Sequence, residues 1–191
     1  MQTSKRTFPT AILLDRDGVI NFDSPDYILS PEQWKAIPGS LEAIAKLTQA
    51  NISIAIVSNQ SAIGRGMIDH EILQNIHAKM LLSIEALGGR IDHVAYCIHA
   101  PSDGCSCRKP LPGMVLESLN ALNISNEPQN VYMIGDSLRD MQAAWAAQVS
   151  GILVQSGYGN AAGILAKARL HDPNIQSFPD LAAAVCSILE H

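Results

Sequence analysis

An apolar run that stops abruptly at an acidic pair constrains the fold of this chain more than any other feature. Residues 11–14 read Ala-Ile-Leu-Leu, and Asp15, Asp17 and Gly18 come directly after them. A short apolar run bounded by turn residues is typical of a strand buried in a parallel sheet. In open α/β sheets, chemistry lies just beyond the carboxyl ends of such strands. The stretch therefore predicts a buried strand followed by two carboxylates at an active-site edge.

The acidic pair alone leaves other interpretations open. Asp-x-Asp-Gly also resembles the start of an EF-hand calcium loop. That loop needs glycine at its sixth position and glutamate at its twelfth, whereas a loop starting at Asp15 has Ile20 and Asp26 there. A polar turn without chemistry is the simplest alternative, and the other strand ends must decide between these interpretations.

Composition and charge narrow the class of protein. The 191 residues are 47% hydrophobic and 16% charged, as expected for a globular domain with a sizeable core. The net charge is −5 without a basic block, so neither nucleic acid nor a membrane surface is expected as a partner. No apolar run approaches the roughly 20 residues that span a bilayer, and no signal-peptide hydrophobic region is seen at the N-terminus. We expect one domain, residues 1–191, in the cytoplasm.

Strand-like and helix-like segments alternate along the chain. Strands are predicted at 11–14, 52–57, 91–98, 131–134 and 152–154, and helices at 41–50, 70–87, 112–123, 138–148, 161–169 and 179–189. Helical crossovers of this length connect parallel strands. The pattern predicts an α/β fold with a doubly wound parallel sheet.

Polar residues follow four of these strands. They are Asp15 and Asp17, then Ser58 and Asn59, then a Cys/His loop with Lys109, and finally Asp136 and Asp140. Carboxylates can hold Mg²⁺ together with water and phosphate oxygens. A hydroxyl and an ammonium group can clamp a phosphoryl group and neutralise its charge. One aspartate can attack as a nucleophile while another transfers the proton. Together the four strand ends favour phosphoryl transfer.

These strand-end motifs resemble those of the haloacid dehalogenase superfamily. Leu13-Leu14-Asp15-Arg16-Asp17-Gly18 is similar to its first motif, Ser58 to its second, Lys109 to its third, and Gly135-Asp136-Ser137-x-x-Asp140 to its fourth. The longer stretches 15–21, 58–66 and 107–114 resemble phosphatases of this superfamily that act on heptose 1,7-bisphosphate. The resemblance runs from Ala11 to Gly159. Ser58 stands where these phosphatases often have threonine, and Ala62 where they often have glycine.

The resemblance implies a role for each catalytic residue. Asp15 would be the nucleophile that forms an aspartyl phosphate, and Asp17 the general acid and base. Ser58 and Lys109 would hold the transferred phosphoryl group. A larger set of loop residues would contact the sugar or its second phosphate, namely Asp23, Ser24, Pro25, Asp26, Tyr27, Asn59, Gln60, Ser61, Arg65 and Arg108.

The resemblance also implies a magnesium site. Mg²⁺ would bind the carboxylates of Asp15 and Asp136 and the backbone carbonyl of Asp17. Asp140 would orient the site from behind these ligands, with a third metal carboxylate as the alternative role.

Three cysteines and a histidine gather in residues 97–107. Cys97, His99, Cys105 and Cys107 fit a closed tetrahedral zinc site. A Cys105–Cys107 disulfide would be strained, and thiols and a histidine that bind nothing are the remaining alternative. The resemblance implies zinc, although the loop is shorter than is usual in the family. We hypothesise that zinc fixes this loop so that Lys109 and Arg108 point at the substrate.

The resemblance implies a Mg²⁺-dependent phosphatase that removes the 7-phosphate of D-glycero-D-manno-heptose 1,7-bisphosphate, in nucleotide-activated heptose and lipopolysaccharide core biosynthesis. A histidinol-phosphate phosphatase is the alternative, because it shares the first motif and a zinc loop. A non-catalytic zinc-stabilised phosphosugar-binding protein is a third hypothesis, but it would not need a nucleophile. The segments after the first two strands are too short for an inserted domain. We therefore expect a minimal cap from residues 22–37 and a monomer that acts on a small phosphorylated sugar.

Overall fold

Six parallel strands form the central sheet of the computed structural model, which describes residues 8–190. The strands are β1 (Ala11–Leu14), β2 (Ser53–Asn59), β3 (His93–Cys97), β4 (Val131–Gly135), β5 (Ser150–Val154) and β6 (Gln176–Phe178). The helices are α1 (Ser40–Gln49), α2 (His70–Ala86), α3 (Gly113–Ala121), α4 (Leu138–Ala146), α5 (Ala161–Arg169) and α6 (Leu181–Glu190), with 3₁₀ turns at Pro101–Asp103 and Pro128–Asn130. In residues 8–190, no helix combines the length and apolar character that a membrane span requires.

The predicted doubly wound parallel sheet is confirmed, since each pair of neighbouring strands is parallel. The predicted helices and the first five strands end within two residues of their observed bounds. The sixth strand was not predicted, because Gln176 and Ser177 break any apolar run there. Its place is set by pairing with β5, where Val154 lies opposite Phe178.

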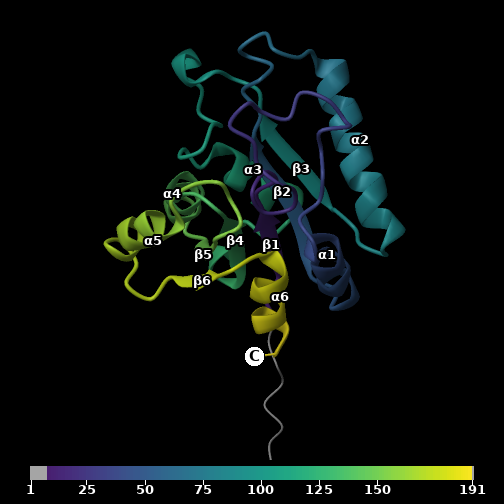
Figure 1. The fold of residues 1–191 in the computed structure, drawn as a ribbon. Coiled ribbons are helices and arrows are strands. Elements are labelled where there is room, and N and C mark those ends of the chain that lie inside the picture. The colour runs from purple at the N-terminus through teal and green to yellow at the C-terminus, as the bar shows by residue number, and fades with distance from the viewer. Residues whose placement is uncertain (1–7, 191) are drawn as a thin grey trace, which may run out of the picture.

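Alternate side chains of the strands enter two apolar layers. On β1, Ile12 and Leu14 pack in one cluster with residues of α1, α2 and α6. Ala11 and Leu13 pack in the other cluster with residues of α3 and α4. A smaller cluster joins α5 to α4 and β5. Figure 1 shows the resulting layers, with α1 and α2 to the right of the sheet and α4 and α5 to its left. Burial on both faces explains why the strands are continuously apolar.

The strand order β3-β2-β1-β4-β5-β6 places a topological switch at the centre of the sheet. The chain moves outward from β1 through β2 to β3 and then returns to the other side of β1 as β4. A crevice opens beyond the carboxyl ends of two such strands, because their connections leave in opposite directions. Asp15 follows β1 and Asp136 follows β4. Both therefore lie at the edge where this fold binds ligands.

The loop of residues 22–37 covers part of this edge and is anchored from beneath. Trp34 is buried, and its Nε1 donates a hydrogen bond of 2.9 Å to Asn21 Oδ1. Lys79 on α2 donates to the backbone oxygens of Pro31 at 2.6 Å and Trp34 at 3.0 Å. These bonds fix the loop to the body of the fold and bring its first residues to the rim of the crevice.

Candidate active site

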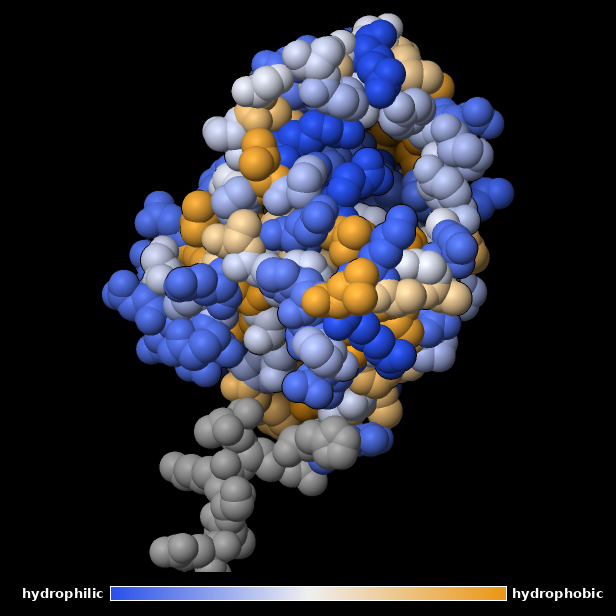
Figure 2. Space-filling model, turned by 90° about the vertical axis from the view of Figure 1, so that its left-hand side faces the viewer, coloured by the Kyte–Doolittle hydropathy of each residue, from blue (hydrophilic) through white to orange (hydrophobic). Residues whose placement is uncertain are grey.

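A cavity of about 250 Å³ lies at the carboxyl ends of the strands. The sequence-predicted residues that line it are Asp15, Asp17, Asp23, Ser24, Pro25, Tyr27, Ser58, Asn59, Gln60, Ser61, Arg65, Arg108, Lys109 and Asp140. Asp26 is exposed and does not line the cavity. The face shown in Figure 2 is hollowed in its upper part, where hydrophilic residues surround the hollow. The lining is therefore mostly polar and comes from the end of β2 and the segments after β1, β2, β3, β4 and β5, which include residues 22–37.

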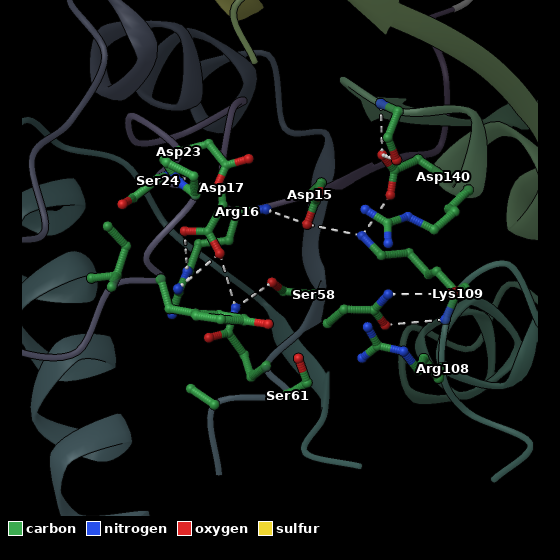
Figure 3. Close-up of a pocket in the computed structure, with 18 of the residues that line it drawn as sticks. Asp15, Arg16, Asp17, Asp23, Ser24, Ser58, Ser61, Arg108, Lys109 and Asp140 are labelled. Atoms are coloured by element: carbon green, nitrogen blue, oxygen red, sulfur yellow. Dashed lines mark hydrogen bonds and ion pairs between the residues drawn. The ribbon is translucent and has the colours of Figure 1, made fainter. Parts of the chain in front are cut away.

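A buried ammonium group holds the centre of the site. Lys109 is 2% exposed, and its Nζ lies 2.8 Å from Asp15 Oδ1 and 2.6 Å from Asp140 Oδ1. It also donates a hydrogen bond of 2.8 Å to the backbone oxygen of Val57. Burial opposes the charge, but attraction to Asp140 and Asp15 outweighs it and raises the pKa of the amine. Figure 3 shows Lys109 between these two carboxylates.

The lysine is held in place through the bonds of Asp140 to the start of α4 and through Asn59. Asp140 Oδ2 accepts bonds from the backbone nitrogen of Ser137 at 3.0 Å and from its hydroxyl at 2.6 Å, which caps the start of α4. Asn59 bonds both backbone groups of Lys109, each at 3.1 Å. Asp140 thus contacts Lys109. Its role, either orienting the site from behind the metal ligands or serving as a third metal carboxylate, stays a prediction. Asn59 was predicted to contact substrate. It lines the cavity, and its amide is engaged with the backbone of Lys109.

Three carboxylates gather beside the lysine. Oxygens of Asp15, Asp136 and Asp140 all lie within 4.8 Å of one another. Burial, followed by repulsion from the neighbouring carboxylates, raises the pKa of Asp136 to about 8. Burial also raises the pKa of Asp15, to about 7. Crowded oxygens that resist carrying charge together are a suitable donor set for a hard divalent cation, so these residues fit Mg²⁺.

The loop after β5 packs against this carboxylate cluster. Ser156 Oγ donates a hydrogen bond of 2.7 Å to the backbone oxygen of Gly18. A Cβ on Gly18 would lie 2.7 Å from Asp136 Oδ2, and a Cβ on Gly157 would collide with the same atom. Sequence reasoning missed this loop, although Ser156 and Gly157 follow a strand just as the other motifs do. Tyr158 of the same loop and Arg139 of α4 also line the cavity and were not predicted.

The predicted cysteine and histidine ligands converge in a second cluster. Cys97 Sγ lies 3.4 Å from His99 Nδ1, 3.6 Å from Cys105 Sγ and 3.2 Å from Cys107 Sγ. Bonds of about 2.0–2.3 Å to zinc give tetrahedral edges of roughly 3.3–3.8 Å, close to these separations. All four cysteines of the chain are free. The donor set and its spacing fit zinc.

Comparisons with known proteins agree with this fold. The family model for haloacid dehalogenase-like hydrolases matches residues 11–148. The chain belongs to this family of hydrolases.

Its similar relatives carry a more particular name. The D-glycero-beta-D-manno-heptose-1,7-bisphosphate 7-phosphatase of Bordetella bronchiseptica is 47% identical over 148 residues, which cover 78% of this chain and 82% of that protein. The protein of the same name from Pseudomonas aeruginosa is 38% identical, over 94% of this chain and 97% of that protein. The crystal structure of the B. bronchiseptica D,D-heptose 1,7-bisphosphate phosphatase, complexed with magnesium and phosphate, has a TM-score of 0.88 and 42% identity, covering 95% of this chain and 98% of that one.

The contact between Gly157 and Asp136 predicts that Gly157→Ala weakens Mg²⁺ binding. The added Cβ would displace the Asp136 carboxylate, and we expect the dissociation constant to rise about 10- to 100-fold, as when a metal ligand loses its support. Isothermal titration with Mg²⁺ measures it. Gly159→Ala is the matched control, because its Cβ meets only the end of the Ile164 side chain at 3.1 Å. Equal affinities in the two variants would contradict the prediction.

Proposed function

We propose that this protein is a Mg²⁺-dependent phosphatase that removes the 7-phosphate of D-glycero-D-manno-heptose 1,7-bisphosphate. The observation that carries the proposal is the Asp15 carboxylate, paired with Lys109 Nζ at 2.8 Å inside a cluster of three carboxylates. Relatives that carry this activity in their names are 38–47% identical over most of the chain. The reaction would serve nucleotide-activated heptose and lipopolysaccharide core biosynthesis.

Asp15 is the proposed nucleophile. Its Oδ1 is fixed by Lys109 Nζ and by the backbone nitrogen of Arg16 at 2.7 Å. Both contacts use the same oxygen, so Oδ2 is left to attack phosphorus. The new bond joins Oδ2 to phosphorus, and the bond between phosphorus and the sugar oxygen breaks, which leaves an aspartyl phosphate.

The remaining roles follow from the charges that develop. Asp17 gives its proton to the departing sugar oxygen and then takes a proton from the water that attacks the aspartyl phosphate. This second displacement releases inorganic phosphate and restores Asp15. Ser58 would donate to a phosphoryl oxygen, and the positive charge of Lys109 would offset the charge of the phosphoryl group throughout. Mg²⁺, held by Asp15, Asp136 and the backbone carbonyl of Asp17, would neutralise phosphoryl charge.

The rest of the cavity lining would contact the sugar and its second phosphate. Asp23, Tyr27 and Arg108 surround the open mouth. The Arg65 guanidinium lies 5.8 Å from the centre of the Tyr27 ring, so these two residues hold each other at the rim. Asp26 lies outside the lining and would reach only a substrate that extends past the rim.

We also propose a single-domain monomer in the cytoplasm. The described residues that line the cavity all lie around the carboxyl edge of one sheet. A reducing compartment keeps thiols available for zinc, so the proposed compartment and the proposed zinc site support each other. The net charge of −5 does not favour nucleic acid or anionic membranes as partners.

Zinc at Cys97, His99, Cys105 and Cys107 is proposed as a structural ion. These residues begin at the end of β3 and stop two residues before Lys109. Arg108 Nη1 donates to the backbone oxygen of His99 at 3.3 Å. Closing the loop around zinc would therefore fix the stretch that presents Arg108 and Lys109 to the cavity.

Replacing the nucleophile tests the covalent mechanism. We expect Asp15→Asn to lower turnover at least about 10³-fold, the scale on which a catalytic nucleophile acts, while thermal unfolding stays cooperative. Phosphate release measures turnover. Asp172→Asn, the same exchange in the loop before β6, should keep wild-type activity. Unchanged phosphate release from Asp15→Asn would refute the aspartyl phosphate.

A substrate panel tests the assigned specificity. Both anomers of heptose 1,7-bisphosphate, fructose 1,6-bisphosphate and histidinol phosphate are compared by kcat/KM. We expect a heptose bisphosphate to exceed the others by at least about tenfold, or about 1.4 kcal/mol, with heptose 1-phosphate as the product by NMR. A preference for histidinol phosphate would overturn the substrate assignment and leave the phosphatase mechanism intact.

Removal of one thiol tests the zinc site. Cys105→Ser should lower the zinc content from one ion per chain and lower the midpoint of thermal unfolding, because the loop loses a ligand. Activity should fall even with Mg²⁺ in excess. Cys186→Ser, the same exchange on α6, is the control. Full activity in protein shown by metal analysis to be zinc-free would exclude the proposed role of zinc.

A further inference from the structure

The Asp17 carboxylate accepts four hydrogen bonds from three side chains. Arg16 Nε donates to Oδ1 at 3.0 Å and Arg16 Nη2 to Oδ2 at 2.9 Å. Asn21 Nδ2 donates to Oδ1 at 2.8 Å and Gln60 Nε2 to Oδ2 at 3.1 Å. An ionised carboxylate offers about four acceptor sites. Asp17 is thus saturated, and its orientation is imposed by its neighbours.

Arg16 is an arginine buried inside the protein, which is unusual for this residue type. Its side chain is 1% exposed, and a buried guanidinium is strongly unfavourable unless it is paired. In the part of the chain that the structure describes, Asp17 is its only ion-pair partner. His77 on α2 adds no second charge, because burial and the nearby Arg16 lower its pKa to about 4. The fork of Arg16 is therefore committed to one carboxylate.

Gln60 joins Asp17 to Ser58. Its Nε2 donates to Asp17 Oδ2 at 3.1 Å and to Ser58 Oγ at 2.8 Å, and the residue is 5% exposed. The amide nitrogen must face Asp17, because an ionised carboxylate can only accept. Since Ser58 Oγ accepts this bond, the proton of its own hydroxyl is left for an oxygen in the cavity. Figure 3 shows Ser58 and Asp17 linked in this way.

Asn21 ties the same group to the loop of residues 22–37. It is fully buried, and its Oδ1 accepts a hydrogen bond of 2.9 Å from Trp34 Nε1. Its Nδ2 is the donor to Asp17 Oδ1. Both ends of the amide are used, so Asn21 cannot turn without breaking a buried bond.

We propose that Arg16, Asn21 and Gln60 form a positioning clamp for Asp17, and that Gln60 aligns the proton donor with the phosphoryl-binding hydroxyl of Ser58. The inference rests on the proposed function, in which Asp17 transfers the proton. Gln60 was predicted to contact substrate, and the clamp gives it a positioning role instead.

The clamp favours proton transfer to the sugar oxygen. The proton leaves Asp17 for the sugar oxygen as the bond between that oxygen and phosphorus breaks. Donors from Arg16, Asn21 and Gln60 hold the Asp17 carboxyl group in one orientation. The group is therefore already placed for the transfer when the bond breaks, and no further reorientation is needed.

The test compares two leaving groups in Gln60→Met, which keeps the length of the side chain and removes its donors. The sugar phosphate is heptose 1,7-bisphosphate, whose leaving oxygen needs a proton. The leaving oxygen of p-nitrophenyl phosphate does not. We expect the first-turnover release of the leaving group to slow about 100-fold for the sugar phosphate and less than about tenfold for the aryl ester. Gln142→Met, the same exchange on an exposed position of α4, should match wild type for both.

Arg16→Lys provides a second variant. It keeps the positive charge and loses the planar fork, so we expect the same selective slowing of the sugar phosphate. If thermal unfolding shows that Gln60→Met is not folded, Arg16→Lys alone tests the clamp. Arg90→Lys, at a half-exposed ion pair with Asp92, is its control. Equal slowing of both esters, or no slowing, would overturn the clamp.

The wild-type enzyme separates this inference from the proposed function. If it hydrolyses neither ester in the presence of Mg²⁺, the proposed phosphatase fails and the clamp fails with it. If it hydrolyses both and the variants show no dependence on the leaving group, only the clamp fails.

Discussion

A buried positive charge between two buried carboxylates organises the site. An ammonium group inside a protein is stable only with good partners, and Lys109 Nζ finds them in Asp15, Asp140 and the backbone oxygen of Val57. These partners come from the end of β1, the first turn of α4 and the inside of β2. The position of the lysine therefore depends on the correct placement of all three elements. The cap of α4 and the side-chain bonds of Asn59 maintain that position.

Two opposite electrostatic environments lie side by side around this charge. Asp15 and Asp136 are buried from solvent and lie close to other carboxylates, which disfavours their charged forms. A cation bound between them would relieve this repulsion. Asp17 is instead surrounded by donors from Arg16 and other side chains. Two aspartates separated by a single residue thus have different chemistry because different neighbours surround them.

Much of the site could be predicted because parallel strands bring their ends together. Asp15 and Lys109 were placed by rules that need only strand order and polarity. The clamp on Asp17 could not be predicted, since which amide faces which carboxylate depends on side-chain geometry. Gly157 was missed for a related reason: its importance lies in the missing Cβ next to Asp136. The short β6 was missed because tertiary pairing with β5, not local pattern, makes it a strand.

The central switch point also bears on how the molecule acquires its metal. Asp15 belongs to the first strand of the chain and Asp136 to the end of the fourth, yet β1 and β4 are neighbours in the sheet. During synthesis, the early half of the chain emerges with only one side of the proposed magnesium site. A cation held by both carboxylates would then bind only after β4 is inserted beside β1. Cation binding at this site would stabilise the completed fold. It would give little stabilisation to a chain that has formed only its first three strands.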